Sequence, residues 1–177
     1  MKRNLAILFC ILFFFQELKS QSKYGNDSIN CVMNLSLYRE YYKQKNYNDA
    51  VKPWRWVYNN CPSSSGNIFK NGPILIKYLI KKNPENKKEY TDTLMMIYDK
   101  RIQLFGKQGY VLGRKGSDLI RYVPSSYEKA HSILEKSIEL QGNKSEAGTL
   151  LAYFKATTLM EKNLKVDKQI VLESYAR

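Results

Sequence analysis

An amphipathic stretch early in the chain places the strongest constraint on its fold. Leu37 and Tyr41 lie four residues apart, and Ala50, Trp54 and Val57 lie four and three residues apart. Side chains at these spacings share one face of an α-helix. The small alanine lets two helices approach closely, and the large side chains fill the space beside it. The stretch therefore predicts two antiparallel helices joined by a short connection.

The spacing of the large residues in this stretch also resembles the tetratricopeptide repeat. The residues that carry the resemblance are Leu37, Tyr41, Tyr47, Ala50, Trp54, Val57 and Pro62. In that family each repeat of about 34 residues folds as a helix pair. The resemblance implies an all-α fold in which antiparallel helix pairs stack into a right-handed superhelix, an α-solenoid. The alternative is an amphipathic helical hairpin of another kind.

The pattern recurs later in the chain, where Tyr127, Ala130 and Leu134 repeat the spacing found between residues 47 and 54. Apolar periodicity, with proline and glycine as breakers, predicts helices at about 31–45, 48–60, 72–82, 84–105, 111–122, 126–141, 145–162 and from 168 onward. We therefore expect a helical-repeat domain over 31–177. Its last helix has no evident polar cap, so we expect the domain to be the front part of a longer array, with docking of this end on a partner as the alternative.

The first 20 residues have the pattern of a secretory signal peptide. Lys2 and Arg3 precede an apolar run of about a dozen residues, and Ser20 provides a small residue at a plausible cleavage point. The apolar run is short for a membrane span. We expect cleavage before Gln21, a flexible polar leader at 21–30, and a periplasmic or cell-envelope location. An uncleaved membrane anchor and lipid attachment at Cys10 are the alternatives.

Two cysteines follow the signal peptide, Cys31 and Cys61. An even number of cysteines in an exported chain favours a disulfide. Cys31 opens the first predicted helix and Cys61 follows the second, and antiparallel neighbours bring these two ends together. The sequence predicts a Cys31–Cys61 bridge, with two buried free thiols as the alternative.

The chain carries a formal net charge of +13. Such an excess favours acidic protein surfaces, anionic lipid or nucleic acid as partners, although a basic solvated surface without a partner is also consistent with it. Export disfavours nucleic acid, so none is expected. The first alternative to protein binding is a peripheral membrane-surface protein that binds anionic lipid or glycolipid through Lys81, Lys82, Lys87 and Lys88. The second is a basic helical protein that binds nucleic acid, which would require the chain to remain in the cytosol.

A glycine-rich basic segment lies at residues 106–116. Together with Phe105 it reads FGKQGYVLGRKG. Its spacing matches neither a phosphate-binding loop nor a dinucleotide fingerprint. The segment predicts a turn followed by close helix packing, with an anion site formed by Lys107, Arg114 or Lys115 as the alternative.

The sequence contains no recognisable catalytic or metal-binding pattern. His131 is the single histidine, and it neighbours neither cysteines nor an acidic cluster. Its place directly after Ala130 predicts a surface position on a helix. We therefore expect no enzyme activity, no catalytic or metal-binding residues and no cofactor.

Tetratricopeptide arrays bind peptides or helices on a concave face, and the resemblance assigns this face to Leu35, Arg39, Tyr42 and Lys43. The chain after Tyr24 is also similar to exported tetratricopeptide proteins of Bacteroidota-type bacteria. The stretches that carry this similarity are CVMNLSLYREYYKQKNYNDAVKPWRWVYNNCP, DTLMMIYDKRIQLFG and GYVLGRKGSDLIRY. Together the resemblances imply a non-catalytic scaffold in the bacterial envelope, whose partners are proteins or peptides with acidic or aromatic segments.

Overall fold

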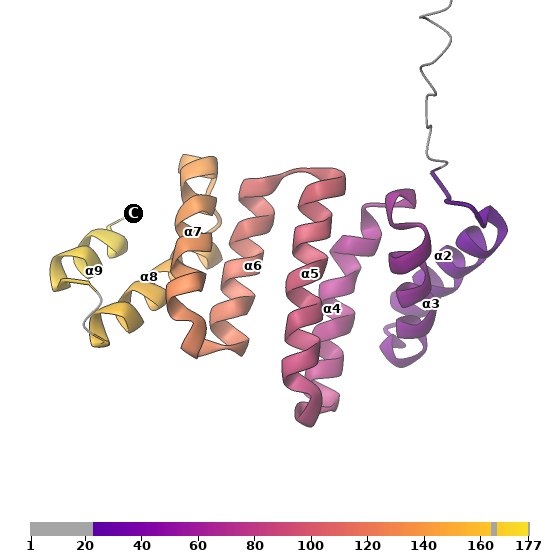
Figure 1. Ribbon diagram of the computed structural model, residues 1–177, viewed down its shortest axis with the longest axis horizontal. Helices are drawn as coiled ribbons and strands as arrows, with labels where there is room; N and C mark the ends of the chain where they lie inside the picture. The colour runs from indigo at the N-terminus through magenta and orange to yellow at the C-terminus, as the bar shows by residue number, and fades with distance from the viewer. Residues whose placement is uncertain (1–22, 164–165, 177) are drawn as a thin grey trace, which may run out of the picture.

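The computed structural model describes residues 23–163 and 166–176, and these residues form helices and turns without any strand. The predicted all-α fold is confirmed. The helices follow one another in a row from α2 at one end of the molecule to α9 at the other (Figure 1). They are α2 (Ser28–Lys43), α3 (Tyr47–Asn60), α4 (Asn67–Lys82), α5 (Lys87–Phe105), α6 (Gln108–Tyr122), α7 (Tyr127–Gln141), α8 (Ala147–Lys162) and α9 (Lys168–Tyr175).

Each helix packs on its neighbours in sequence, and α6 also contacts α8. Short 3-10 turns that begin with a proline separate three pairs of consecutive helices, at Pro62–Ser64, Pro84–Asn86 and Pro124–Ser126. Proline fits the first position of such a turn because that position needs no backbone N–H donor. The prolines thus define where one helix ends and the next begins.

The predicted signal peptide at 1–20 lies outside the described residues. Within the part of the chain that the structure describes, no helix has both the length and the apolar character needed to cross a membrane. α2 begins at Ser28, earlier than predicted, because the Asp27 carboxylate accepts a hydrogen bond from the backbone N–H of Asn30 at 3.0 Å. This side chain caps the helix within the segment that the sequence assigned to a flexible leader.

The core consists of two clusters of buried apolar side chains. The first cluster joins α2, α3, α4 and α5 and includes Val111 of α6, and the second joins α6, α7 and α8. Met95 of α5 packs against both clusters. The row of helices is therefore held together by a continuous apolar interior from α2 to α8.

Trp54 is among the largest fully buried side chains of the first cluster. Its ring stacks on Tyr58, with the ring centroids 5.4 Å apart, and its Nε1–H donates to the carbonyl oxygen of Ile68 at 2.9 Å. The ring also contacts Gly72, where an added Cβ would lie 2.6 Å from Trp54 Cζ2. These contacts support α4 around Gly72 and Pro73, so the helix begins at Asn67 and not at Gly72 as predicted.

The buried face of α2 differs from the predicted face. Cys31, Leu35 and Tyr38 are buried, whereas Leu37 is 42% exposed and Tyr41 is half-buried. Cys31, Leu35 and Tyr38 lie at positions i, i+4 and i+7, which share one side of a helix. Because Cys31 is bonded to the end of α3, that side of α2 faces the core and Leu37 turns toward solvent.

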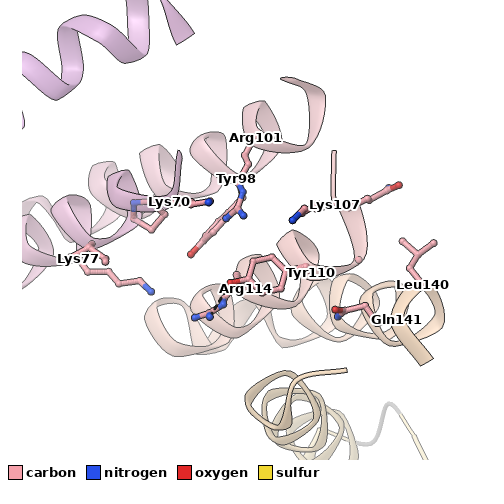
Figure 2. A pocket seen from close by; sticks show the side chains of 13 residues that line it. Lys70, Lys77, Tyr98, Arg101, Lys107, Tyr110, Arg114, Leu140 and Gln141 are labelled. Atoms are coloured by element: carbon pink, nitrogen blue, oxygen red, sulfur yellow. Dashed lines mark hydrogen bonds between the residues drawn. The ribbon is translucent and has the colours of Figure 1, made fainter. Parts of the chain in front are cut away.

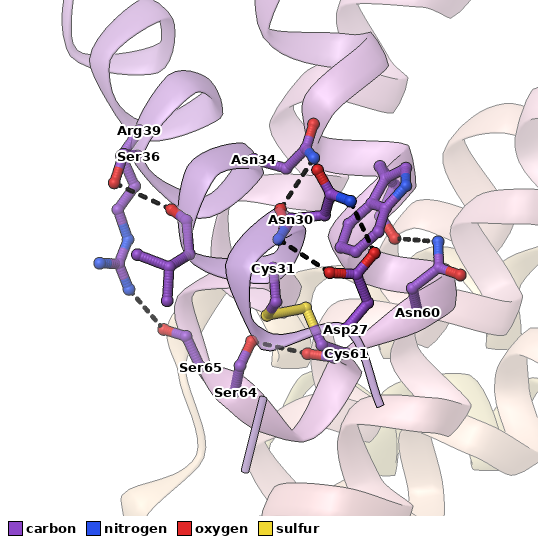
Figure 3. The surroundings of a disulfide bond; sticks show 12 residues. Asp27, Asn30, Cys31, Asn34, Ser36, Arg39, Asn60, Cys61, Ser64 and Ser65 are labelled. Atoms are coloured by element: carbon purple, nitrogen blue, oxygen red, sulfur yellow. Dashed lines mark hydrogen bonds between the residues drawn. A yellow bond between two sulfur atoms is a disulfide. The ribbon is translucent and has the colours of Figure 1, made fainter. Parts of the chain in front are cut away.

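The predicted disulfide between Cys31 and Cys61 is confirmed. The Cα atoms of the two residues lie 6.2 Å apart, and the bond joins the first turn of α2 to the residue that follows α3 (Figure 3). Both cysteines are buried. The hydroxyl of Ser64 donates to the Cys61 carbonyl oxygen at 2.6 Å, which fixes the turn beyond the bridge.

The glycine-rich segment serves mainly for helix packing, as predicted. Only Gly106 and Lys107 form the turn, and Gly109, Gly113 and Gly116 lie within α6. A Cβ on Gly113 would lie 2.5 Å from Thr149 Oγ1, and one on Gly116 would lie 2.5 Å from Leu134 Cγ. These two glycines allow α7 and α8 to pack closely on α6.

Candidate functional site

The four residues that the resemblance assigned to a binding face do not form one exposed surface. Leu35 is buried in the core, so it is not available to a partner. Tyr42 is half-buried and packs on Tyr47, with ring centroids 5.5 Å apart. Arg39 and Lys43 are exposed, and Arg39 donates to Ser65 Oγ at 3.0 Å (Figure 3).

A hollow of about 870 Å³ opens elsewhere, between α4, α5, α6 and the end of α7 (Figure 2). Part of its wall is apolar, from Pro73, Ile74 and Leu140, and Tyr98 and Tyr110 contribute aromatic rings. Five basic side chains also line it: Lys70, Lys77, Arg101, Lys107 and Arg114. This combination of a concave shape, apolar surface and convergent charge is typical of a ligand site.

Two of the five basic side chains are neutralised by carboxylates. Lys77 Nζ lies 2.6 Å from Asp118 Oδ2, and Arg114 Nε lies 3.3 Å from Glu146 Oε2. The other three, Lys70, Arg101 and Lys107, form no ion pair with any carboxylate of the described residues. The side chains of these three residues point into the same space beside the α5–α6 turn (Figure 2). The uncompensated positive charge of the hollow is concentrated at this end.

Tyr110 orders two of the guanidinium groups. The Cζ atoms of Arg101 and Arg114 each lie 5.3 Å from the centroid of the Tyr110 ring, within the range of cation–π attraction. Arg114 also donates from Nη2 to the Tyr110 hydroxyl oxygen at 3.1 Å. The Tyr110 ring thus restricts the conformational freedom of both guanidinium groups.

The floor of the hollow contains a buried polar cluster that joins three helices. The hydroxyl of Tyr98 in α5 donates to Asp118 Oδ2 in α6 at 2.6 Å, and Lys77 in α4 pairs with the same oxygen. Burial raises the pKa of Tyr98, and the negative charge of Asp118 raises it further. The hydroxyl therefore stays protonated and remains a hydrogen-bond donor.

We expect Asp118→Ala to lower the free energy of unfolding by about 3 kcal/mol, since it removes both the counter-charge of Lys77 and the acceptor of a buried hydroxyl. This loss lies at the low end of the range for breaking a buried ion pair because the Lys77 side chain is 30% exposed. Asp92→Ala is the matched control, because Asp92 pairs with Lys88 and both side chains are mostly exposed, at 64% and 93%. We expect that change to lower the free energy of unfolding by less than about 1 kcal/mol, as measured by urea denaturation. Equal losses in the two variants would contradict a stabilising role for the buried cluster.

The single histidine is less exposed than predicted. His131 is half-buried, and its ring packs against Tyr153 of α8 with centroids 4.7 Å apart. The close approach of α7 and α8 covers one side of the imidazole. Among the described residues, no group of three or more histidine, cysteine or acidic side chains is arranged to hold a metal ion.

Comparisons with protein-family models, with curated proteins and with solved structures found no match for this chain. The class of protein is therefore defined by its own geometry. Residues 23–163 and 166–176 form consecutive packed helices, with a disulfide between Cys31 and Cys61 and a basic hollow between α4 and α7.

The residues of the basic hollow were largely missed from the sequence. Lys70 and Arg101 are separated by 31 positions in the numbering and lie on different helices, so no local motif contains both. The only sequence signal was the glycine-rich basic segment, where an anion site was the alternative to packing. Lys107 and Arg114 of that segment line the hollow, and Lys115 instead pairs with Asp99.

Proposed function

We propose that this chain is an exported, non-catalytic helical scaffold that binds an acidic segment of a partner protein in its basic hollow. The observation that carries the proposal is the convergence of Lys70, Arg101 and Lys107, which have no ion-pair partner in the described ranges. Three like charges held together repel one another, and an acidic ligand relieves that repulsion.

The apolar wall beside the charges favours a protein segment over a simple anion. Ile74 is 42% exposed and Leu140 is 48% exposed, and both line the hollow. Protein interfaces combine an apolar centre with charged groups that set orientation. A peptide that carries carboxylates next to apolar side chains matches both parts of this surface.

Two further features support the proposed setting. Consecutive antiparallel helices that pack on their sequence neighbours agree with a tetratricopeptide-like superhelix, which we include in the proposal. The Cys31–Cys61 bridge favours an oxidising compartment, and with the predicted signal peptide it supports a periplasmic or envelope location.

A matched pair of charge reversals tests the proposal. We expect Lys70→Glu combined with Arg101→Glu to weaken binding of a short fluorescent peptide rich in glutamate and leucine by about tenfold or more, because two favourable charge contacts become repulsive. The control combines Lys87→Glu with Lys88→Glu, which changes the net charge equally at the exposed start of α5. The control should change affinity by about twofold at most.

Fluorescence anisotropy at two salt concentrations measures both affinities, and a peptide with glutamine in place of glutamate measures binding without carboxylates. Equal weakening by the two double variants would show that total charge, and not the hollow, attracts the peptide. Unchanged binding of the acidic peptide to the Lys70→Glu, Arg101→Glu variant would contradict the proposal directly.

Binding to anionic lipid is the second candidate, since Lys81, Lys82, Lys87 and Lys88 are exposed around the α4–α5 turn. Two of them have other contacts: Lys82 donates to Asn48 Oδ1 at 2.8 Å, and Lys88 lies 3.2 Å from Asp92 Oδ2. Flotation with phosphatidylglycerol vesicles tests this candidate. Vesicle binding that is lost in the Lys87 and Lys88 variant, but kept in the Lys70 and Arg101 variant, would favour lipid over protein as the partner.

A further inference from the structure

A second, smaller hollow adjoins the basic one. It has a volume of about 210 Å³, and its lining consists of Gly66, Lys70, Arg101, Phe105 and Lys107. Lys70, Arg101 and Lys107 line the larger hollow as well. The three unpaired cations therefore lie between two hollows, and an anion bound by them would have space on both sides.

The smaller hollow has an aromatic wall with open space in front of it. Phe105 is 38% exposed, and its ring packs on the buried Phe69 with centroids 5.5 Å apart. Gly66 faces the same ring, and a Cβ added to Gly66 would lie 3.5 Å from Phe105 Cδ1, at ordinary contact distance. The absence of a side chain at Gly66 thus keeps this space free beside the ring.

The backbone at Lys107 is unusual and helps to place its side chain. Lys107 has a φ of 56°, in the left-handed region that favours glycine, and it is the residue that precedes the first turn of α6. Conformations of this kind cost free energy and occur often at functional sites. Among the described residues, Lys45 is the other non-glycine residue with positive φ, and it lies at the α2–α3 turn, outside both hollows.

From these observations we infer that Lys70, Arg101 and Lys107 form one binding site for a pair of neighbouring side-chain carboxylates. The smaller hollow then binds an apolar side chain next to them. The inference rests on the proposed function and defines its ligand more closely. The recognised segment is two adjacent acidic residues beside an aromatic or large aliphatic residue. Three cations favour two carboxylates over one because the positive charge is then more fully compensated.

Three fluorescent peptides test which side chains the site recognises. Their termini are capped, which removes the terminal charges. The first contains two glutamates next to a phenylalanine, the second replaces both glutamates with glutamine, and the third replaces the phenylalanine with serine. We expect the first peptide to bind about tenfold more tightly than the second, and about fivefold more tightly than the third. Equal affinities for the three peptides would overturn the inference.

Two variants test the carboxylate-binding part and the apolar part of the inferred site separately. Lys107→Gly removes the charge without disturbing the backbone, because glycine readily adopts positive φ, and it should weaken the first peptide about fivefold or more. Lys45→Gly is the matched control and should leave affinity unchanged. Gly66→Leu fills the smaller hollow, so it should abolish the preference for phenylalanine over serine while the preference for glutamate over glutamine remains.

The outcomes distinguish this inference from the proposed function. In one outcome, Lys70→Glu with Arg101→Glu abolishes acidic-peptide binding, while Lys107→Gly and Gly66→Leu leave the affinities for all three peptides unchanged. The hollow then binds acidic segments, but the inferred site for two carboxylates and an apolar side chain is overturned. If the Lys70 and Arg101 variant binds the first peptide like the unmodified protein, the proposed function fails together with the inference. Circular dichroism of each variant confirms that its helices are intact.

Discussion

Trp54→Ala should lower the free energy of unfolding by about 3–5 kcal/mol, the range for removal of a large aromatic side chain from a core. Trp54 is 1% exposed, and it joins α3 to α4 through the Ile68 carbonyl and the surface of Gly72. Its loss leaves a cavity between the two helices and removes the hydrogen bond from the indole N–H to the Ile68 carbonyl. Guanidinium denaturation followed by circular dichroism measures the change.

Trp56→Ala is the matched control for this prediction. Trp56 lies on the same helix but is only half-buried at the edge of the first cluster. We expect its replacement to cost clearly less, about 1–2 kcal/mol, because part of the ring already contacts water. A loss at Trp56 as large as that at Trp54 would contradict the stabilising role of the buried contacts between Trp54 and α4.

Removal of the disulfide by Cys31→Ser with Cys61→Ser should lower the free energy of unfolding by about 3–4 kcal/mol. The two cysteines are separated by 30 positions, and the chain-entropy model gives this value for a loop of that length. The bridge restricts the unfolded chain more than the folded one, in which α2 and α3 already pack together. Urea denaturation of the protein and the variant, each with and without a reductant, measures the effect.

The reductant provides an internal control. It should lower the unfolding midpoint of the unmodified protein toward that of the double variant, and it should leave the variant unchanged. A midpoint of the unmodified protein that does not respond to complete reduction, verified by thiol labelling, would contradict a stabilising bridge.

Helix positions were largely predictable because they depend on local features of the sequence. The ends of α3 at Asn60, α4 at Lys82 and α5 at Phe105 agree with the predictions. In each case a proline, or a glycine that follows the helix, interrupts the backbone hydrogen bonding. The start of α4 was predicted less well, since Gly72 and Pro73 weaken a helix locally and contacts from Trp54 compensate for them.

The face that each helix buries was less predictable. The apolar Leu37 and Tyr41 predicted one face of α2, but the structure buries the face that contains Leu35 and Tyr38. α2 has apolar residues on more than one side, because Ile29, Val32 and Met33 are exposed as well. With such a broad apolar distribution, periodicity alone cannot define the inward side, and the contact with α3 determines it.

The candidate site illustrates the same division between local and tertiary information. The sequence by itself determined the all-α character, most helix ends, the cysteine pair and the excess of positive charge, since these follow from neighbouring residues and composition. Only the tertiary structure decided which cations are neutralised. Asp118 reaches Lys77 and Glu146 reaches Arg114, while Lys70, Arg101 and Lys107 converge without a carboxylate among the described residues. Electrostatic interactions depend on distance and burial, and these are set only when separate helices pack together.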